Sequence, residues 1–291
     1  MNLTRYDRQE KLFGKTGQDL ISATRVAIIG LGGTGSQVAQ QLAYLGVRKF
    51  CLIDFDVVEL SNLNRLIGAG SVSVGKKKVK NANDLIRYIN PEAEILCFEI
   101  DLRRGGLRLD AALRACNYIF GCVDNDAARL ALLTISARYG IPLIDIAAEA
   151  RPADREVGGE VFFFEGKGCL LCGGLLDQKE IRHFNGTETD RQFEKEVYGI
   201  SKETLAGGGP TVVMINGLAA SIAATEFMYA VTELSPPLTY THIHRQSTFP
   251  RWGTSHDITF NKDCYYCHEF RHAVEEKRKI IRDKNTLPVI K

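Results

Sequence analysis

A net charge of one sign is absent from this sequence, in which 37 Lys and Arg residues are balanced by 35 Asp and Glu residues. The resulting charge of +2 gives no basic field, so we expect no nucleic-acid partner. Residues 1–15 lack the apolar core of a secretory signal peptide, because charged residues interrupt them. We therefore expect a cytoplasmic protein.

An uninterrupted membrane-spanning segment is also missing. The longest apolar stretch, residues 211–231, contains Asn216, Gly217, Ser221 and Glu226. A carboxylate in the bilayer core is costly. We predict instead that this stretch is a buried helix, in the core or at a subunit interface, and we expect no membrane contact.

The composition is that of a globular protein. The 291 residues are 45% hydrophobic and 25% charged, unlike a disordered chain. A chain of this length buries enough surface to fold without disulfides. Because no repeat, low-complexity tract or Pro/Gly-rich linker separates its halves, we expect one domain with a C-terminal elaboration.

Strand and helix patterns alternate through the first half, which predicts a Rossmann-like, doubly wound α/β sheet with its ligand at the carboxyl ends of the strands. In the second half, residues 175–209 are polar and poorly periodic, and a charged, solvated terminal helix is predicted from residue 269 onward. The predicted parallel strands are residues 25–30, 49–54, 94–100, 118–123 and 142–147; the helices are 36–46, 79–89, 110–115 and 126–139; the antiparallel strands are 160–164 and 239–243.

A glycine-rich turn, GLGGTG at residues 30–35, follows the first predicted strand. Its backbone N–H groups precede a helix and suit a phosphate. Asp54 ends the second predicted strand, where an acidic side chain hydrogen-bonds a ribose hydroxyl. Taken alone, this fingerprint favours a nicotinamide or flavin dinucleotide enzyme.

The residues after Asp54 favour a different chemistry. A polar run containing Asn62 and Arg65 leads into GKKK at residues 75–78, which places cations beyond the nucleotide turn. A dinucleotide oxidoreductase has no need for these cations. Attack on the α-phosphate of ATP does need them, because negative charge builds on that phosphate and on departing pyrophosphate.

The fourth predicted strand ends in Asp124 and Asn125, which brings a carboxylate to the same crevice. Mg²⁺ binds through such carboxylates together with substrate phosphates. An Asx pair also suits a helix N-cap, and the two roles are compatible. Arg8 and the lysine run have simple alternatives too, as exposed surface residues.

Together these stretches resemble the ThiF/MoeB family, the adenylating enzymes for ubiquitin-like proteins and sulfur carriers. The resemblance implies an adenylation domain over residues 1–270, with a nucleotide-binding half at 25–150, a zinc-bearing half at 151–270 that docks the carrier, and a charged tail at 271–291. It covers about residues 5–267 and rests on RYDRQ at 5–9, the turn at 30–35, DFD at 54–56, residues 61–65 and 75–78, NP at 90–91, Asp124-Asn125 with Arg129, and two Cys-x-x-Cys pairs.

The resemblance also implies a reaction and its residues. A small carrier protein would use its C-terminal glycine carboxylate to attack ATP, giving an acyl-adenylate and pyrophosphate. Asp54 would hold the ribose, Asp124 would hold Mg²⁺, and Arg8 would reach the phosphates of the neighbouring subunit in a homodimer. The implied catalytic residues are Arg8, Arg65, Lys78 and Asp124; the implied nucleotide-binding residues are Gly30, Gly32, Gly33, Gly35, Asp54, Asp56, Asn62, Arg65, Lys78, Asp124 and Asn125. Leu66 replaces the glutamine common after this arginine, which we expect to tune the pocket.

The eight cysteines fall into two groups. Two Cys-x-x-Cys pairs suit one tetrahedral structural Zn²⁺, with two redox pairs as the alternative; the resemblance favours zinc. The zinc pairs are Cys169 with Cys172 and Cys264 with Cys267; the other four, Cys51, Cys97, Cys116 and Cys122, are predicted to be buried, inert thiols.

A thioester-forming cysteine is absent from the place where such relatives carry one. Residues 173–210 contain no cysteine, and Ala206 cannot attack a carbonyl. Either the enzyme stops at the adenylate, or Ala206 stands in place of a cysteine. Sulfur transfer, ubiquitin-like conjugation through a separate thiol-bearing protein, and peptide or tRNA modification stay open as later steps.

Two other functions stay open as well. One is a catalytically silent partner that uses the fold to dock a ubiquitin-like protein, although the presence of Arg65, Lys78 and Asp124 argues against it. The other is a nicotinamide oxidoreductase, which the cation-rich run disfavours.

Overall fold

The computed structural model describes residues 5–151, 156–187, 189–190, 192, 211–246, 254–255 and 261–286. Within these residues, eight strands form one sheet in the order β3-β2-β1-β4-β5-β6-β7-β8. The parallel strands are β1 (Arg25–Ile29), β2 (Lys49–Ile53), β3 (Glu94–Phe98), β4 (Tyr118–Gly121) and β5 (Leu143–Arg151); β6 (Glu156–Phe164), β7 (Tyr240–Gln246) and β8 (Thr254–Ser255) extend the sheet antiparallel. This confirms the doubly wound sheet predicted from the alternating pattern.

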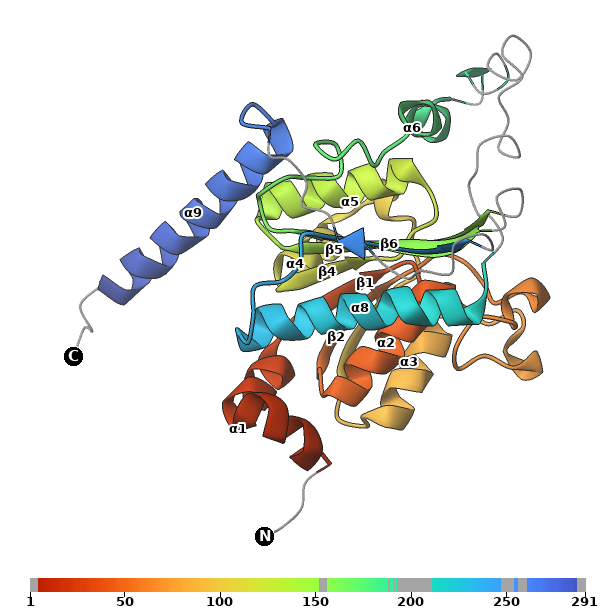
Figure 1. Cartoon of the computed structure of the whole chain (residues 1–291), viewed down its shortest axis with the longest axis horizontal. Helices are drawn as coiled ribbons and strands as arrows, with labels where there is room; N and C mark the ends of the chain where they lie inside the picture. Colours follow the sequence, from red (N-terminus) through yellow and green to blue (C-terminus); the bar gives the residue numbers. More distant parts are fainter. Residues whose placement is uncertain are drawn as a thin grey trace.

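Helices cover both faces of the sheet (Figure 1). One face carries α2 (Gly33–Leu45), α3 (Lys78–Ile89) and α8 (Val213–Thr232), with α1 (Asp7–Ala23) packed on α8; the other carries α4 (Leu107–Arg114) and α5 (Asp126–Tyr139), with α6 (Gln178–Asn185) and α9 (Tyr265–Thr286) packed on α5. Short 3₁₀ turns lie at Leu60–Asn62, Ser71–Ser73 and Leu102–Arg104.

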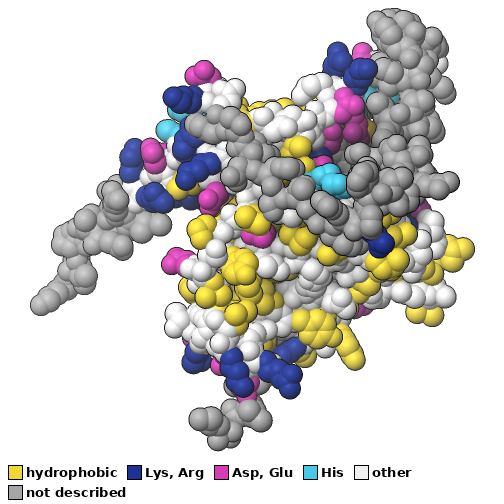
Figure 2. Space-filling view, in the orientation of Figure 1, with side chains coloured by type: hydrophobic (Ala, Val, Ile, Leu, Met, Phe, Trp, Pro, Cys, Tyr) yellow, Lys and Arg dark blue, Asp and Glu magenta, His cyan; other side chains and the backbone are white. Residues whose placement is uncertain are grey.

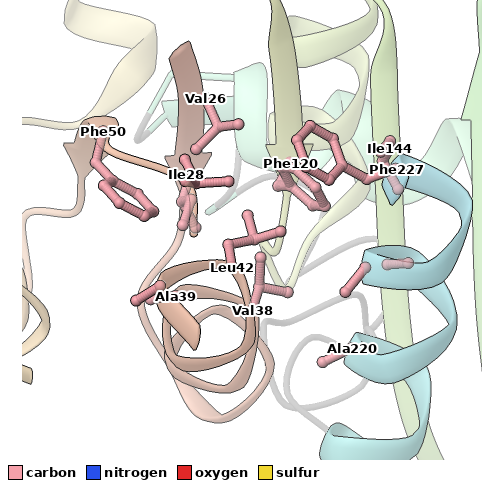
Figure 3. Packing of buried hydrophobic residues seen from close by; sticks show 14 of the residues in the cluster. Val26, Ile28, Val38, Ala39, Leu42, Phe50, Phe120, Ile144, Ala220 and Phe227 are labelled. Atoms are coloured by element: carbon pink, nitrogen blue, oxygen red, sulfur yellow. The ribbon is translucent and has the colours of Figure 1, made fainter. Parts of the chain in front are cut away.

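A hydrophobic core fills the layer between the sheet and the helices α2 and α8. Figure 3 shows Ile28 and Phe120 of the sheet facing Leu42 of α2 and Phe227 of α8, and all four are fully buried. The first two strands are apolar on both faces, as expected for parallel strands covered on both sides. The rigid layer places the carboxyl ends of β1, β2 and β4 side by side.

Helix α8 is the predicted buried helix. By length and composition alone it is the one helix in the described part of the chain that could span a membrane. It packs instead against α1, α2, β5 and β6, and Ala219, Ala223 and Phe227 are completely buried. Only 39% of the most apolar 18-residue stretch of this helix is buried, so the helix is buried along one side and not all round. Figure 2 shows apolar side chains exposed over the region where α8 lies.

Several predicted boundaries are corrected. Helix α1 was not predicted, and α6 lies within the stretch that has little periodicity. The β5–β6 hairpin extends to the pair Arg151–Glu156, beyond the apolar residues that the sequence pattern detects. Helix α9 begins at Tyr265 rather than at residue 269. It is not solvated on all sides as predicted, because Phe270 packs edge-to-face on Phe164 with ring centroids 5.0 Å apart.

The prediction of four buried thiols is wrong for Cys97. Cys51 and Cys116 are buried and Cys122 is half-buried, but Cys97 is exposed. Cys97 lies on β3, the edge strand, which has a neighbour on one side only and a largely exposed surface. The stretch 205–210, with Ala206, lies outside the described residues.

Candidate functional site

The glycine-rich turn lies at the carboxyl end of β1, where the strand order reverses. β2 pairs with one side of β1 and β4 with the other, an arrangement that creates a ligand-binding crevice in doubly wound sheets. Helix α2 begins at Gly33, and its N-cap, Gly32, makes no side-chain cap hydrogen bond. The first N–H groups of α2 therefore have no partner within the helix and suit an anion.

Close packing explains two of the glycines in this turn. Gly30 has φ 83°, and a Cβ there would collide with the carbonyl oxygen of Cys122, the residue that follows the neighbouring strand β4. A Cβ on Gly35 would collide with the carbonyl oxygen of Gly30. By contrast, a Cβ on Gly32 would have no atom within 4 Å, so the turn is open at that position.

Asp54 faces the turn from the end of β2. Its Oδ2 accepts a hydrogen bond of 2.6 Å from the Leu31 N–H, and its Oδ1 accepts one of 2.8 Å from the Asp56 N–H. Burial raises the pKa of Asp54, while the Leu31 hydrogen bond and the Lys78 ammonium oppose that rise. Lys78 begins α3, and its Nζ lies 2.7 Å from Oδ2 of Asp56. The predicted ribose-binding acid and the predicted phosphate-binding cation are thus in one place.

The loop after β2 brings Arg65 to the turn. A Cβ on Gly33 would lie 3.2 Å from Cγ of Arg65, so the arginine stem passes directly over the start of α2. Its Nη1 donates to the Ser61 carbonyl at 2.8 Å and to Oδ1 of Asn64 at 3.0 Å. Asn62 closes the preceding turn, with its Oδ1 accepting from the Glu59 N–H at 3.2 Å, and Leu66 is buried behind the loop.

The sequence suggests a Mg²⁺ ligand and a helix N-cap for the pair Asp124 and Asn125, and the structure gives the two residues different positions. Asn125 is the N-cap of α5, because its Oδ1 accepts a hydrogen bond of 2.9 Å from the Ala128 N–H. Asp124 is exposed, and its Oδ1 accepts from the Asn125 side chain at 3.2 Å. A carboxylate that faces solvent beyond the end of β4 is suited to a hydrated Mg²⁺.

A buried ion-pair network supports the start of α5. Nε and Nη2 of Arg129 donate to Oδ2 of Asp145 at 2.8 and 2.6 Å, and Nη1 donates to Oδ1 of Asp126 at 3.1 Å. Arg129 Nη1 also donates to the Leu175 carbonyl at 3.2 Å, and Asp126 accepts from the Asp177 N–H at 2.6 Å. The network joins the first turn of α5 to β5 and to the segment that follows the first cysteine pair.

Arg8 is not part of this constellation. The next residue, Gln9, donates to the Leu45 carbonyl at 2.7 Å, which is the C-terminal end of α2, whereas the turn is at the N-terminal end. A helix of 13 residues is about 20 Å long. A phosphate contact from Arg8 therefore requires a second subunit.

The two Cys-x-x-Cys pairs meet in one cluster. The four sulfur atoms lie within 4.8 Å of one another, with Sγ–Sγ distances of 3.6, 3.5 and 3.9 Å along the cluster. Tetrahedral zinc at about 2.3 Å from each sulfur would separate the sulfurs by about 3.8 Å. Hydrogen bonds from Cys267 and the other two thiols lower the pKa of Cys169 to about 5. The hydrogen bond with Cys169 in turn raises the pKa of Cys267, so only the spacing indicates a metal. That spacing fits a structural Zn²⁺ that ties the start of α9 to the middle of the chain.

Asn216 also belongs to this site, although the sequence patterns assign it no role. It is 1% exposed in the first turn of α8, and a Cβ on Gly33 would collide with its Nδ2. The available signal is an amide within an otherwise apolar helix, but the sequence does not reveal that this helix lies beside the turn.

Known proteins resemble this chain in sequence over much of its length. The ThiF family profile matches residues 6–266. Molybdopterin-synthase adenylyltransferase of Escherichia coli (strain K12) is 33% identical over 175 residues, 58% of this chain and 67% of that protein. The adenylyltransferase and sulfurtransferase UBA4 of Saccharomyces cerevisiae (strain YJM789) is 32% identical over 48% of this chain and 32% of that protein. The tRNA threonylcarbamoyladenosine dehydratase of Bacillus subtilis (strain 168) is 30% identical over 52% of this chain and 59% of that protein. The matches thus span from about a third to two thirds of these relatives.

Solved structures share the fold. The crystal structure of Escherichia coli MccB with ATP superposes with a TM-score of 0.68 at 19% identity, covering 92% of this chain and 75% of that one. The crystal structure of selenomethionine PaaA gives a TM-score of 0.66 at 23% identity, covering 87% and 82%.

Proposed function

Because the chain belongs to the ThiF family, we propose that it is an ATP-dependent adenylyltransferase that activates the C-terminal glycine carboxylate of a small ubiquitin-like or sulfur-carrier protein. One observation carries the proposal: the N-terminus of α2, which has no side-chain cap, lies together with Arg65 at the carboxyl end of β1. Such a site recognises a phosphate chain.

Each residue has a physical task in this reaction. The N–H groups of the turn hold phosphate oxygens, and Asp54 accepts hydrogen bonds from the ribose hydroxyls. The carrier carboxylate forms a bond to the α-phosphorus as the bond to pyrophosphate breaks, and Arg65 and Lys78 balance the growing negative charge. When bound, Mg²⁺ neutralises phosphate charge, and Asp124 is the residue that would hold it.

The cysteine cluster and the exposed apolar surface support two further parts of the proposal. Four free thiols that share one zinc require a reducing compartment, which supports a cytoplasmic location. We also infer a homodimer, since Arg8 cannot reach the turn of its own chain. A groove between α1, α2 and α8, lined in part by Tyr44, Leu45 and Met228, offers apolar surface for such contacts.

Exchange of radioactive pyrophosphate into ATP tests the activity. We expect exchange that depends on a carrier protein ending in glycine, and a loss of at least a hundredfold in Asp124→Ala. Asp19→Ala, which removes an exposed acid on α1 that forms an exposed ion pair with Lys15, serves as the matched control and keeps wild-type exchange. Absence of exchange with every carrier, or undiminished exchange in Asp124→Ala, would contradict the proposal.

The Bacillus subtilis relative supplies a second candidate, adenylation of a carboxylate on modified tRNA. The same assay with tRNA bearing threonylcarbamoyladenosine in place of the carrier separates the two substrates. Exchange with the tRNA alone would replace the carrier protein as the substrate while leaving the adenylation chemistry in place.

A further inference from the structure

The amide of Asn216 reaches the nucleotide turn from the second half of the chain. It lies in the first turn of α8, and its Nδ2 occupies the space that a Cβ on Gly33 would need. Gly33 is the first residue of α2, so this amide lies at the positive end of that helix. The stem of Arg65 borders the same space.

Two hydroxyl groups lie against the oxygen end of this amide. Oδ1 of Asn216 accepts from Oγ1 of Thr211 at 2.8 Å and from Oγ1 of Thr34 at 3.3 Å. With its acceptor atom held on that side, the amide directs its donor atom at Gly33.

The donor atom is left without a partner. Asn216 is 1% exposed, and its Nδ2 makes no hydrogen bond to any residue that the structure describes. A buried amide without an acceptor is unfavourable, and proteins retain such groups where a ligand or water supplies the missing partner. The first N–H groups of α2 on this side are also donors, so the missing partner is an acceptor, and the positive end of the helix favours an anionic one.

We propose that Asn216 is a nucleotide-binding residue whose Nδ2 donates to a phosphate oxygen of ATP at the N-terminus of α2. The inference rests on the proposed function and extends it, because the phosphate site then takes a donor from α8 as well as from the turn. It also explains Gly33, since any side chain there would displace the amide.

Nucleotide affinities of Asn216 variants test this role. In Asn216→Asp the donor becomes a charged acceptor, so we expect the affinity for ATP to fall at least tenfold. Asn216→Ala removes the donor without adding charge, so we expect the affinity for ATP to fall threefold to tenfold. Adenosine has no phosphate, so its affinity, measured by competition against a fluorescent ATP analogue, changes less than twofold. Thr232→Ala, at the far end of the same helix and bonded to the Met228 carbonyl at 2.7 Å, keeps both affinities.

The outcomes separate a phosphate contact from a structural role. Equal losses of ATP and adenosine affinity, or unchanged ATP affinity in both variants, would overturn the inference. If Asn216→Asp does not fold, Asn216→Ala decides alone, with its melting temperature measured without ligand. A wild-type protein that binds no ATP would overturn the proposed adenylation itself, whereas ATP binding that ignores Asn216 would overturn only this inference.

Discussion

Arg129→Met should destabilise the protein strongly, because it leaves buried carboxylates unpaired. The Asp145 side chain is 1% exposed, and its Oδ2 accepts two hydrogen bonds from Arg129. Among the described residues its Oδ1 has no hydrogen-bond partner. Removing one member of a buried pair costs roughly 3–5 kcal/mol. At the usual unfolding entropy per residue, a chain of 291 residues would then melt about 5–8 °C lower.

The pH dependence of this loss has a definite sign. Burial raises the pKa of Asp145, and the Arg129 guanidinium opposes that rise. Without the guanidinium the pKa of the folded state rises further above the unfolded value of about 3.9. The folded variant therefore binds the proton more tightly than the unfolded chain, and its stability falls as pH rises through the raised pKa. The gap to wild type should be small near pH 4 and largest at neutral pH.

Calorimetric melting at about pH 5 and about pH 7.5 measures both effects. Arg138→Met is the control, because Arg138 lies exposed on the same helix and its loss should cost less than about 0.5 kcal/mol. Adding Asp145→Asn to Arg129→Met should recover part of the loss at the higher pH. A melting temperature of Arg129→Met equal to wild type, or a gap that does not shrink on acidification, would refute the reasoning.

Two further predictions concern the cysteine cluster and the turn. The purified protein should hold about one zinc per chain, and Cys267→Ser should release the zinc and lower the melting temperature. The control Cys97→Ser, on the exposed edge strand, should change neither the zinc content nor the melting temperature. A wild-type protein that holds no metal would contradict the assignment. Gly33→Ala should weaken ATP binding at least tenfold, because the added Cβ collides with the Asn216 amide. Gly70→Ala is the control, since a Cβ there meets open space, and this variant should bind ATP as wild type does. Equal ATP affinities in both variants would contradict the packing argument.

Strands and helices whose limits are marked by neighbouring residues in the sequence could be predicted. The strands at residues 25–29 and 49–53 are short apolar runs, and α5 was predicted with the bounds that the structure gives, since its N-cap and its terminal glycine are both visible in the sequence. Helix α1 escaped prediction because it is polar and is interrupted at Gly14, where φ is 70°. Cys97 could not be assigned correctly, because a strand's place at the sheet edge depends on topology.

Some residues of the candidate site could likewise be predicted from the sequence, and others could not. The glycine turn and Asp54 could be found because their spacing along the chain reflects one β-α-β unit, whereas Lys78 could be singled out from the lysine run only through the family resemblance. The partners of Arg129 and the position of Asn216 could not be found. Asn216 meets Thr34 across 182 residues of sequence, and Arg129 meets Leu175 across 46, so these contacts depend on the completed fold.

These long-range contacts argue against treating residues 25–150 as an independent nucleotide-binding unit. β5 and β6 pair along nine residues within one continuous sheet, and Phe163 of β6 and Phe227 of α8 complete the core on which α2 rests. The start of α5, which carries Asn125 beside Asp124, is held through Arg129 and Asp126 to residues 175–177. Removal of the second half would expose that core and leave Asp126 and Asp145, the two acids bonded to Arg129, less constrained. The second half is therefore required to form the proposed phosphate site.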